Sequence, residues 1–131
     1  MTESGPVVPS SLLTPDEVEL LVRALLEWGG PGHASDELAR GMGFAGAEDL
    51  LERCRSFRRD LESDTPIESA NWARILLATE IVFVSDLVGS GTEWRTTTGM
   101  NDESTIRMLR TIQRKLGKVL RSHYGRTPTG P

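Results

Sequence analysis

The sequence has few of the side chains that build metal centres and nucleophilic active sites. It contains one cysteine, Cys54, and two histidines, His33 and His123. A single cysteine cannot form an intramolecular disulfide, which agrees with a reducing compartment. His33 lies in a glycine-rich turn, His123 near a helix end and Cys54 on an apolar stripe, so no zinc or catalytic spacing is matched. We therefore expect no catalytic residue, no metal and no cofactor, and a protein that is not an enzyme.

Long apolar runs and targeting signals are also missing. No apolar run reaches the length that a membrane-spanning helix needs. The N-terminal residues MTESGPVVPSS lack the basic start and apolar core of a secretory signal peptide. We expect a cytoplasmic protein with no membrane partner.

The length of the chain is typical of one domain. We place this domain at residues 13–125, between a flexible N-terminal arm (1–12) and a flexible tail (126–131).

What the sequence does contain is a series of helical signals. Thr14 is a predicted N-cap, with Pro15 at the first helical position and Glu17 completing a capping box. The stretch Thr65-Pro66-Ile67-Glu68 repeats this pattern and predicts a second start of the same kind. Apolar residues at helical spacing follow each start. The predicted helices cover about 15–28, 35–43, 47–62, 66–88 and 101–124.

The helix predicted at 66–88 is apolar almost all round, which is typical of the buried centre of a bundle. Trp72, Leu76 and Phe83 should be among its least exposed residues. Its second half, IVFVSDLV, could instead form a buried strand, but no second strand is available to pair with it. The predicted fold class is therefore all-α, a compact irregular or orthogonal bundle of four main helices and one short helix around this central helix.

Two carboxylates, Glu80 and Asp86, lie inside that apolar helix. A buried carboxylate must be paired or have its pKa raised, and a raised pKa would suit a general acid or base. The alternative is a structural acid, held by an arginine or by backbone N–H groups. We expect Glu80 and Asp86 to be structural buried acids.

A stretch rich in glycine and threonine, GSGTEWRTTTG, occupies residues 89–99. A phosphate-binding loop would need a lysine after the glycines and a free helix N-terminus, whereas Asp102 and Glu103 follow here and would repel an anion. Trp94 then either plugs the end of the bundle or, with Arg95, anchors a partner protein. Trp94, Thr96 and Thr98 alternate along the chain, which would also suit an edge strand that pairs with another chain.

Charge is distributed unevenly along the chain. From Asp102 to the end the net charge is +5, whereas the preceding residues carry −9. On a helical wheel, five cations of the last predicted helix share one face, opposite its apolar residues. We call them the basic face: Arg107, Arg110, Arg114, Lys118 and Arg121. We expect no acid four residues away to neutralise them. They either pair with acids elsewhere, such as Glu17, Glu19, Asp49 and Glu52, or bind an acidic partner.

The stretch ELARGMGF resembles the first helix of a helix-turn-helix motif, an α-helical DNA-binding unit. Recognition of DNA would then be the task of the helix at 47–62, which carries four arginines but five acidic residues. DNA affinity depends on neutralising phosphates, so a net-acidic helix in a net-acidic body is a poor candidate.

The pattern as a whole predicts a small non-enzymatic protein that binds another protein, or a second copy of itself as a homodimer, as regulators, inhibitors and immunity proteins do. The binding surface would be the 89–100 loop, with Trp94 and Arg95, together with the basic face. The alternative is a nucleic-acid-binding regulator that uses the helix-turn-helix-like segment (14–62) or the basic last helix. An enzyme that uses Glu80 and Asp86 is the remaining class.

Overall fold

The computed structural model of the chain describes residues 6–28, 35–84 and 102–124. All the regular elements in these ranges are helical, apart from one isolated β-bridge between Val7 and Ile67. This confirms the predicted all-α fold. The elements are the 3₁₀ helix η1 (Pro9–Ser11), α1 (Pro15–Glu27), α2 (Asp36–Gly41), α3 (Ala47–Glu62), α4 (Ser69–Val84) and α6 (Asp102–Tyr124).

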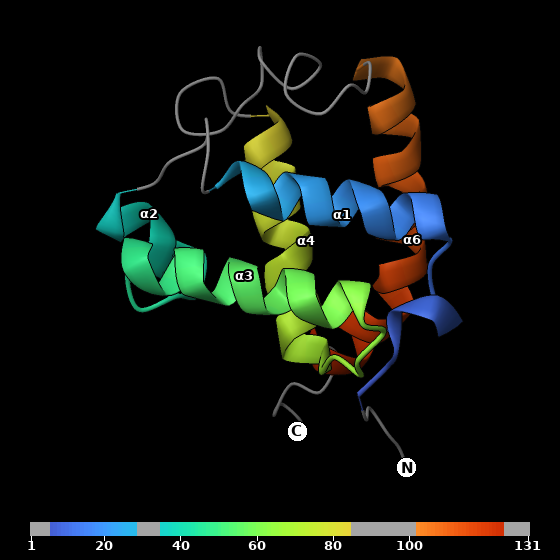
Figure 1. Cartoon of the computed structure of the whole chain (residues 1–131), viewed down its shortest axis with the longest axis horizontal. Helices are drawn as coiled ribbons and strands as arrows, with labels where there is room; N and C mark the ends of the chain where they lie inside the picture. Colours follow the sequence, from blue (N-terminus) through green and yellow to red (C-terminus); the bar gives the residue numbers. More distant parts are fainter. Residues whose placement is uncertain (1–5, 29–34, 85–101, 125–131) are drawn as a thin grey trace, which may run out of the picture.

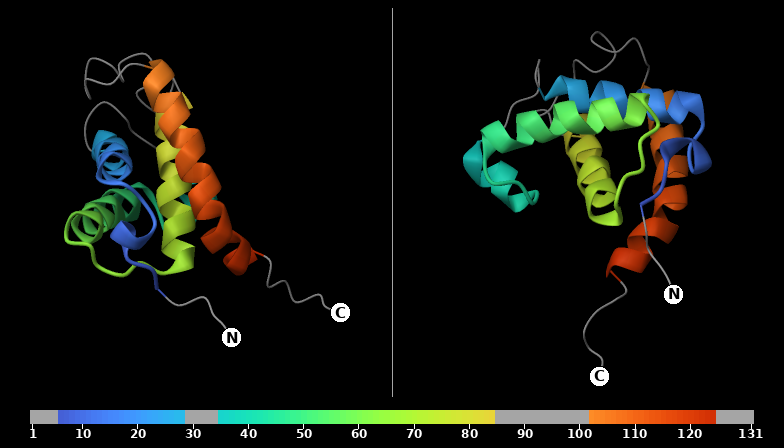
Figure 2. Two further views of the ribbon diagram at one scale, coloured as in Figure 1. Left: turned by 90° about the vertical axis from the view of Figure 1, so that its right-hand side faces the viewer. Right: turned by 60° about the horizontal axis from the view of Figure 1, so that its bottom comes forward.

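The helices form two layers that cross each other. Helices α1 and α3 lie side by side in one layer, and α4 and α6 run antiparallel in the other (Figures 1 and 2). Helix α1 contacts α3, α4 and α6, while the short α2 packs against α3. In the three described ranges, no helix is long and apolar enough to cross a membrane.

The core lies between the two layers. Trp72 is fully buried and Leu76 is buried, as predicted, but Phe83, in the last turn of α4, is only half-buried. Helix α4 is covered by α1 on one side and by α6 on another, which leaves Leu77 36% exposed. The apolar stripes of the other helices supply most of the rest of the core: Leu20, Leu21 and Leu25 from α1, Leu50, Cys54, Phe57 and Leu61 from α3, and Leu109, Ile112 and Leu116 from α6. Trp28, the residue directly after α1, is buried as well.

The start of α1 forms the predicted capping box. The Glu17 backbone N–H donates to Thr14 Oγ1 at 3.2 Å, and the Thr14 N–H donates to Glu17 Oε1 at 2.8 Å. Pro15 occupies the first turn, where it needs no backbone donor. Two of the N–H groups that a helix start leaves without partners are thus satisfied within four residues.

The second predicted capping box is wrong. Helix α4 begins at Ser69, and the Glu68 carbonyl accepts its first hydrogen bonds, from the N–H groups of Asn71 and Trp72. The Thr65 N–H donates instead to the Asp60 carbonyl. Ile67 is held in extended backbone by two hydrogen bonds to Val7, each of 2.9 Å. A residue in such a bridge cannot also be helical, so the helix starts later.

The N-terminal segment from residue 6 lies against the turn that follows α3. Asp64 adopts a left-handed conformation (φ 57°), which Asp tolerates better than most residues. Its carboxylate accepts from the Ser10 N–H at 2.8 Å and from Ser10 Oγ at 2.6 Å. The prolines and serines predicted a flexible arm up to residue 12. The contacts of Val7 with Ile67 and of Ser10 with Asp64 were not predicted. Residues 1–5 and the tail from residue 125 lie outside the described ranges.

Candidate functional site

The last helix presents the basic face on its outer side. Leu109, Ile112 and Leu116 lie three and four residues apart, and they bury one stripe of α6 against the core. Helix α6 packs on α4 and α1, so its other side is left to solvent. All the cations of the basic face are exposed: Arg107, Arg110, Arg114, Lys118 and Arg121.

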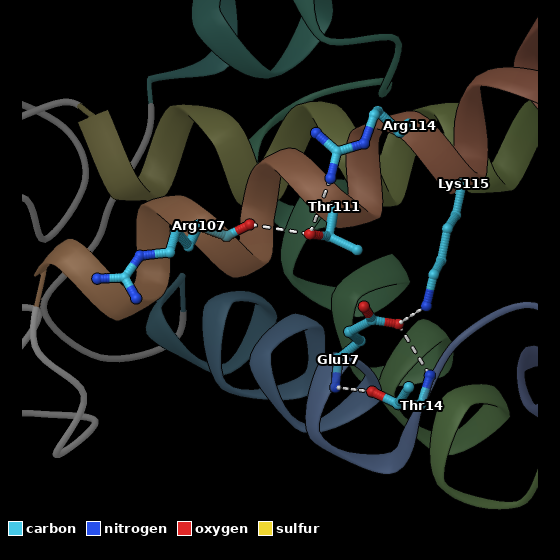
Figure 3. Close-up of polar contacts among 6 residues, drawn as sticks. All are labelled: Thr14, Glu17, Arg107, Thr111, Arg114 and Lys115. Carbon is cyan, nitrogen blue, oxygen red and sulfur yellow. Dashed lines mark hydrogen bonds and ion pairs between the residues drawn. The ribbon is translucent and has the colours of Figure 1, made fainter.

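One member of the basic face has an acidic partner on its own helix. Arg107 Nη2 lies 3.0 Å from Glu103 Oε2, four residues earlier, so the expectation that no acid stands at that spacing was wrong. These side chains are 72% and 82% exposed, and an ion pair so exposed contributes little to stability. Arg114 donates to Thr111 Oγ1 at 3.3 Å, and Thr111 in turn donates to the Arg107 carbonyl (Figure 3).

The other cations of the face have no ionic partner among the described residues. Arg110, Arg114, Lys118 and Arg121 form no ion pair there. The acids considered as candidates to neutralise them do not contact the face. Three of them are occupied elsewhere: Glu17 with Lys115, Glu19 with Arg23, and Asp49 with Arg53.

The cation of α6 that is held internally is Lys115. Its Nζ lies 2.7 Å from Glu17 Oε1, the same oxygen that accepts from the Thr14 N–H (Figure 3). The Glu17 side chain is only 7% exposed, and burial raises its pKa, but the hydrogen bonds from Lys115 and Thr14 outweigh this effect and leave the pKa below its ordinary value. The pair joins the first turn of α1 to the middle of α6.

Lys115 was not among the residues predicted from the sequence, although a signal for it was present. On the helical wheel it lies between the basic face and the apolar stripe, where a lysine can bury its stem and direct its ammonium sideways. Its partner could not be identified, because Glu17 lies 98 residues away.

The two acids predicted in the central helix can be assessed only in part. Glu80 is half-buried, and its Oε2 accepts a 2.6 Å hydrogen bond from Gln113 Nε2 on α6. Its partner is thus a neutral side-chain amide rather than the arginine or the backbone N–H groups that we expected. Asp86, Trp94 and Arg95 lie outside the described residues, as does the rest of the 89–100 loop.

Two observations on the described residues concern nucleophilic and metal chemistry. Cys54 is buried on α3, and burial raises the pKa of its thiol to about 12, against a weaker opposing effect of Arg58. Such a thiol is almost never ionised near neutral pH. Residues 6–28, 35–84 and 102–124 include no group of three or more His, Cys, Asp or Glu side chains that could hold a metal ion.

The helix-turn-helix-like segment (14–62) contains α1, then α2, a turn at Gly43 with a positive φ, and α3. Asp36 Oδ1 accepts from the Ala47 N–H and ties the start of α2 to the start of α3. On α3, Arg53 lies 3.6 Å from Asp49, while Arg55 and Arg59 are exposed. The exposed arginines of this helix thus stand among acids of the same helix.

Comparisons with known protein families, with curated proteins and with solved structures found no match. Function must therefore be inferred from the chemistry that the chain itself presents. Helix α6 offers four exposed cations that have no ionic partner among the described residues. Three of them are guanidinium groups, which suit the oxygens of carboxylates or phosphates.

Proposed function

We propose that the chain is a small cytoplasmic, non-enzymatic protein that regulates or inhibits another protein by binding it through the basic face of α6. The observation that carries this proposal is that Arg110, Arg114, Lys118 and Arg121 are exposed along one side of a packed helix with no acidic partner among the described residues. Surface charges of one sign arranged in this way steer and orient a partner of the opposite sign.

The support that α6 receives from the core favours a binding role over a solvated surface. One side of the helix is fixed by buried leucine and isoleucine, and Lys115 ties it to Glu17. A partner therefore meets cations on a backbone that is already ordered, which reduces the entropy lost on association. Carboxylates at a matching spacing on a partner protein would fit this row.

Nucleic acid is the second candidate, because guanidinium groups bind phosphates as well as carboxylates. The basic face is the feature that favours it. The rest of the chain opposes it, since residues 1–101 carry a net charge of −9, which repels a polyanion at low salt. We therefore rank an acidic protein first.

Two triple charge reversals with the same change in net charge test the proposal. One is Arg110→Glu, Arg114→Glu and Lys118→Glu on α6. The matched control is Arg40→Glu, Arg55→Glu and Arg59→Glu, whose residues are exposed on α2 and α3 and belong to the helix-turn-helix-like segment. Immobilised wild-type and variant proteins are used to capture partners from a lysate of the source cells, and each also enters a gel-shift titration with duplex DNA and with RNA.

The proposal predicts that a protein retained by the wild type and by the control variant is lost from the α6 variant. If the α6 variant retains every protein that the wild type retains, the basic face is not the binding surface. If DNA or RNA binds instead, with an affinity that falls steeply with salt, the second candidate replaces the first. The triple variant that abolishes that binding then identifies the helix in contact with the phosphates.

A further inference from the structure

Residues of η1, of the first turns of α1, and of the last turn of α3 with the turn that follows it line a groove. Figure 1 shows where these elements lie in the fold. The volume of the groove is about 330 Å³, at the lower end of the range for pockets that bind small ligands. Its apolar lining comes from three separate segments of the chain: Pro9, Leu13, Pro15, Val18, Val22 and Leu61. The groove is thus a product of the way in which the N-terminal segment is anchored.

The polar lining of the groove carries one sign of charge. Glu19, Glu62 and Asp64 contribute three carboxylates, and none of the described lysines or arginines lines it. Asp64 stays ionised, because the hydrogen bonds from the Ser10 hydroxyl and N–H hold its pKa below the ordinary value. Glu19 Oε2 lies 2.7 Å from Arg23 Nε, which leaves its other oxygen for a ligand. Glu62 is exposed at the end of α3.

The position of the Asp64 carboxylate at the edge of the groove is fixed by local structure. Its backbone is left-handed, and its carboxylate accepts two hydrogen bonds from Ser10. Leu61 and Val18 also line the groove, where Leu61 is buried and Val18 is half-buried. An apolar floor with a fixed anionic rim is complementary to a chain that combines an aliphatic side chain with neighbouring cations.

We propose that this groove binds a short basic segment of a partner protein, in which one leucine-sized side chain enters the apolar floor and flanking lysines or arginines meet Glu19, Glu62 and Asp64. This surface is separate from the basic face and opposite to it in charge, and the inference does not depend on the function proposed above. The aliphatic stems of the flanking lysines would add apolar contact at the rim.

A labelled hexapeptide with two central leucines and two lysines on each side tests the proposal by fluorescence anisotropy at low salt. Two control peptides replace either the leucines with serines or the lysines with glutamates. The protein variant is Glu62→Lys, and its matched control is Glu37→Lys, an exposed position on α2 with the same change in charge. Lysine in the last turn of a helix is favourable, so Glu62→Lys should fold.

The expected result is binding of the leucine–lysine peptide that is lost with either control peptide. Glu62→Lys should weaken binding about three- to tenfold, in line with the loss of one exposed ionic contact and its replacement by repulsion, while Glu37→Lys leaves binding unchanged. Amide resonances that shift on titration should map to residues 9–22 and 61–64.

Three outcomes would overturn the proposal. One is the absence of binding at millimolar peptide. Another is equal weakening by Glu62→Lys and Glu37→Lys, which would reflect net charge alone. The third comes from sedimentation of the protein without peptide: self-association that Glu62→Lys abolishes would assign the groove to a second copy of the chain.

Discussion

The stretches Thr14-Pro15-Asp16-Glu17 and Thr65-Pro66-Ile67-Glu68 share three of four residue types and differ in structure. The first forms a complete capping box at the start of α1. The second stays extended, and α4 begins after it. The difference lies at the third position, because Asp16 is exposed whereas Ile67 is 2% exposed and pairs with Val7.

A capping box contributes on the order of 1 kcal/mol, whereas burial of an isoleucine side chain contributes about 1.5–3 kcal/mol. Ile67 also gains two backbone hydrogen bonds in the bridge. The long-range contacts therefore exceed the local signal at the second site. At the first site the long-range contact of Glu17 with Lys115 leaves the capping box intact, because Glu17 Oε1 accepts from both Lys115 and the Thr14 N–H. Four substitutions test this ranking, beginning with the largest expected effect.

Ile67→Ala should reduce the free energy of unfolding by about 2–5 kcal/mol, as for other truncations of buried aliphatic side chains. Chemical denaturation followed by circular dichroism measures the change, with Ile106→Ala, at an exposed site on α6, as control. A loss below about 1 kcal/mol would mean that the Thr65 cap forms once the isoleucine side chain is removed. It would contradict the conclusion that burial of Ile67 decides where α4 begins.

Lys115→Met keeps the aliphatic stem but removes the partner of Glu17, and should cost about 1–3 kcal/mol at neutral pH. Because the folded pKa of Glu17 is lowered, its stabilisation is present above the ordinary value of 4.5 and is lost as pH falls through the folded pKa. The difference between variant and wild type should therefore shrink in acid. Lys118→Met, on the exposed face, is the control and should show neither effect; a constant difference from pH 7 to pH 3 would contradict the role of Glu17.

Thr14→Ala removes the side-chain acceptor of the first capping box and should cost about 1 kcal/mol. Thermal and denaturant unfolding at pH 7 both report this change. Stability equal to that of the wild type would show that Pro15 and Glu17 define the start of α1 without the threonine.

Thr65→Ala should have the smallest effect, less than about 0.5 kcal/mol, because this residue is exposed and caps no helix. Its hydroxyl lies 2.8 Å from Ser63 Oγ, an exposed contact that water can replace. Measured beside Thr14→Ala, this substitution gives the sharpest comparison of the two sites. Equal losses at both positions would restore the sequence-based interpretation of Thr65 as a cap.

The features that were predictable from the sequence are those that depend on neighbours three or four residues away. The Thr14 cap, the apolar stripe of α3 and the exposure of the basic face all belong to this class. Glu103 belongs to it as well, four residues from Arg107, and was overlooked. The contacts of Val7 with Ile67 and of Ser10 with Asp64 could not be predicted, since each depends on how the whole chain folds.

The same limit applies to the candidate sites. The basic face is a property of one helix, so a helical wheel reveals it. The groove is a property of three segments that meet only in the folded chain. No periodicity of the sequence brings Pro9, Val18 and Leu61 together. Of the acids at its rim, Glu19 was considered only as a possible partner of the basic face.

The buried thiol of Cys54 has a consequence for how the molecule can be followed in time. With its pKa near 12 and its side chain 2% exposed, it can react with an alkylating reagent only while the helices around it are separated. The rate of labelling by iodoacetamide at neutral pH therefore reports the fraction of molecules in which the structure around Cys54 is open. A ligand that binds only the closed form, at the basic face or in the groove, slows this labelling in proportion to its occupancy, so the cysteine can report binding without a dye.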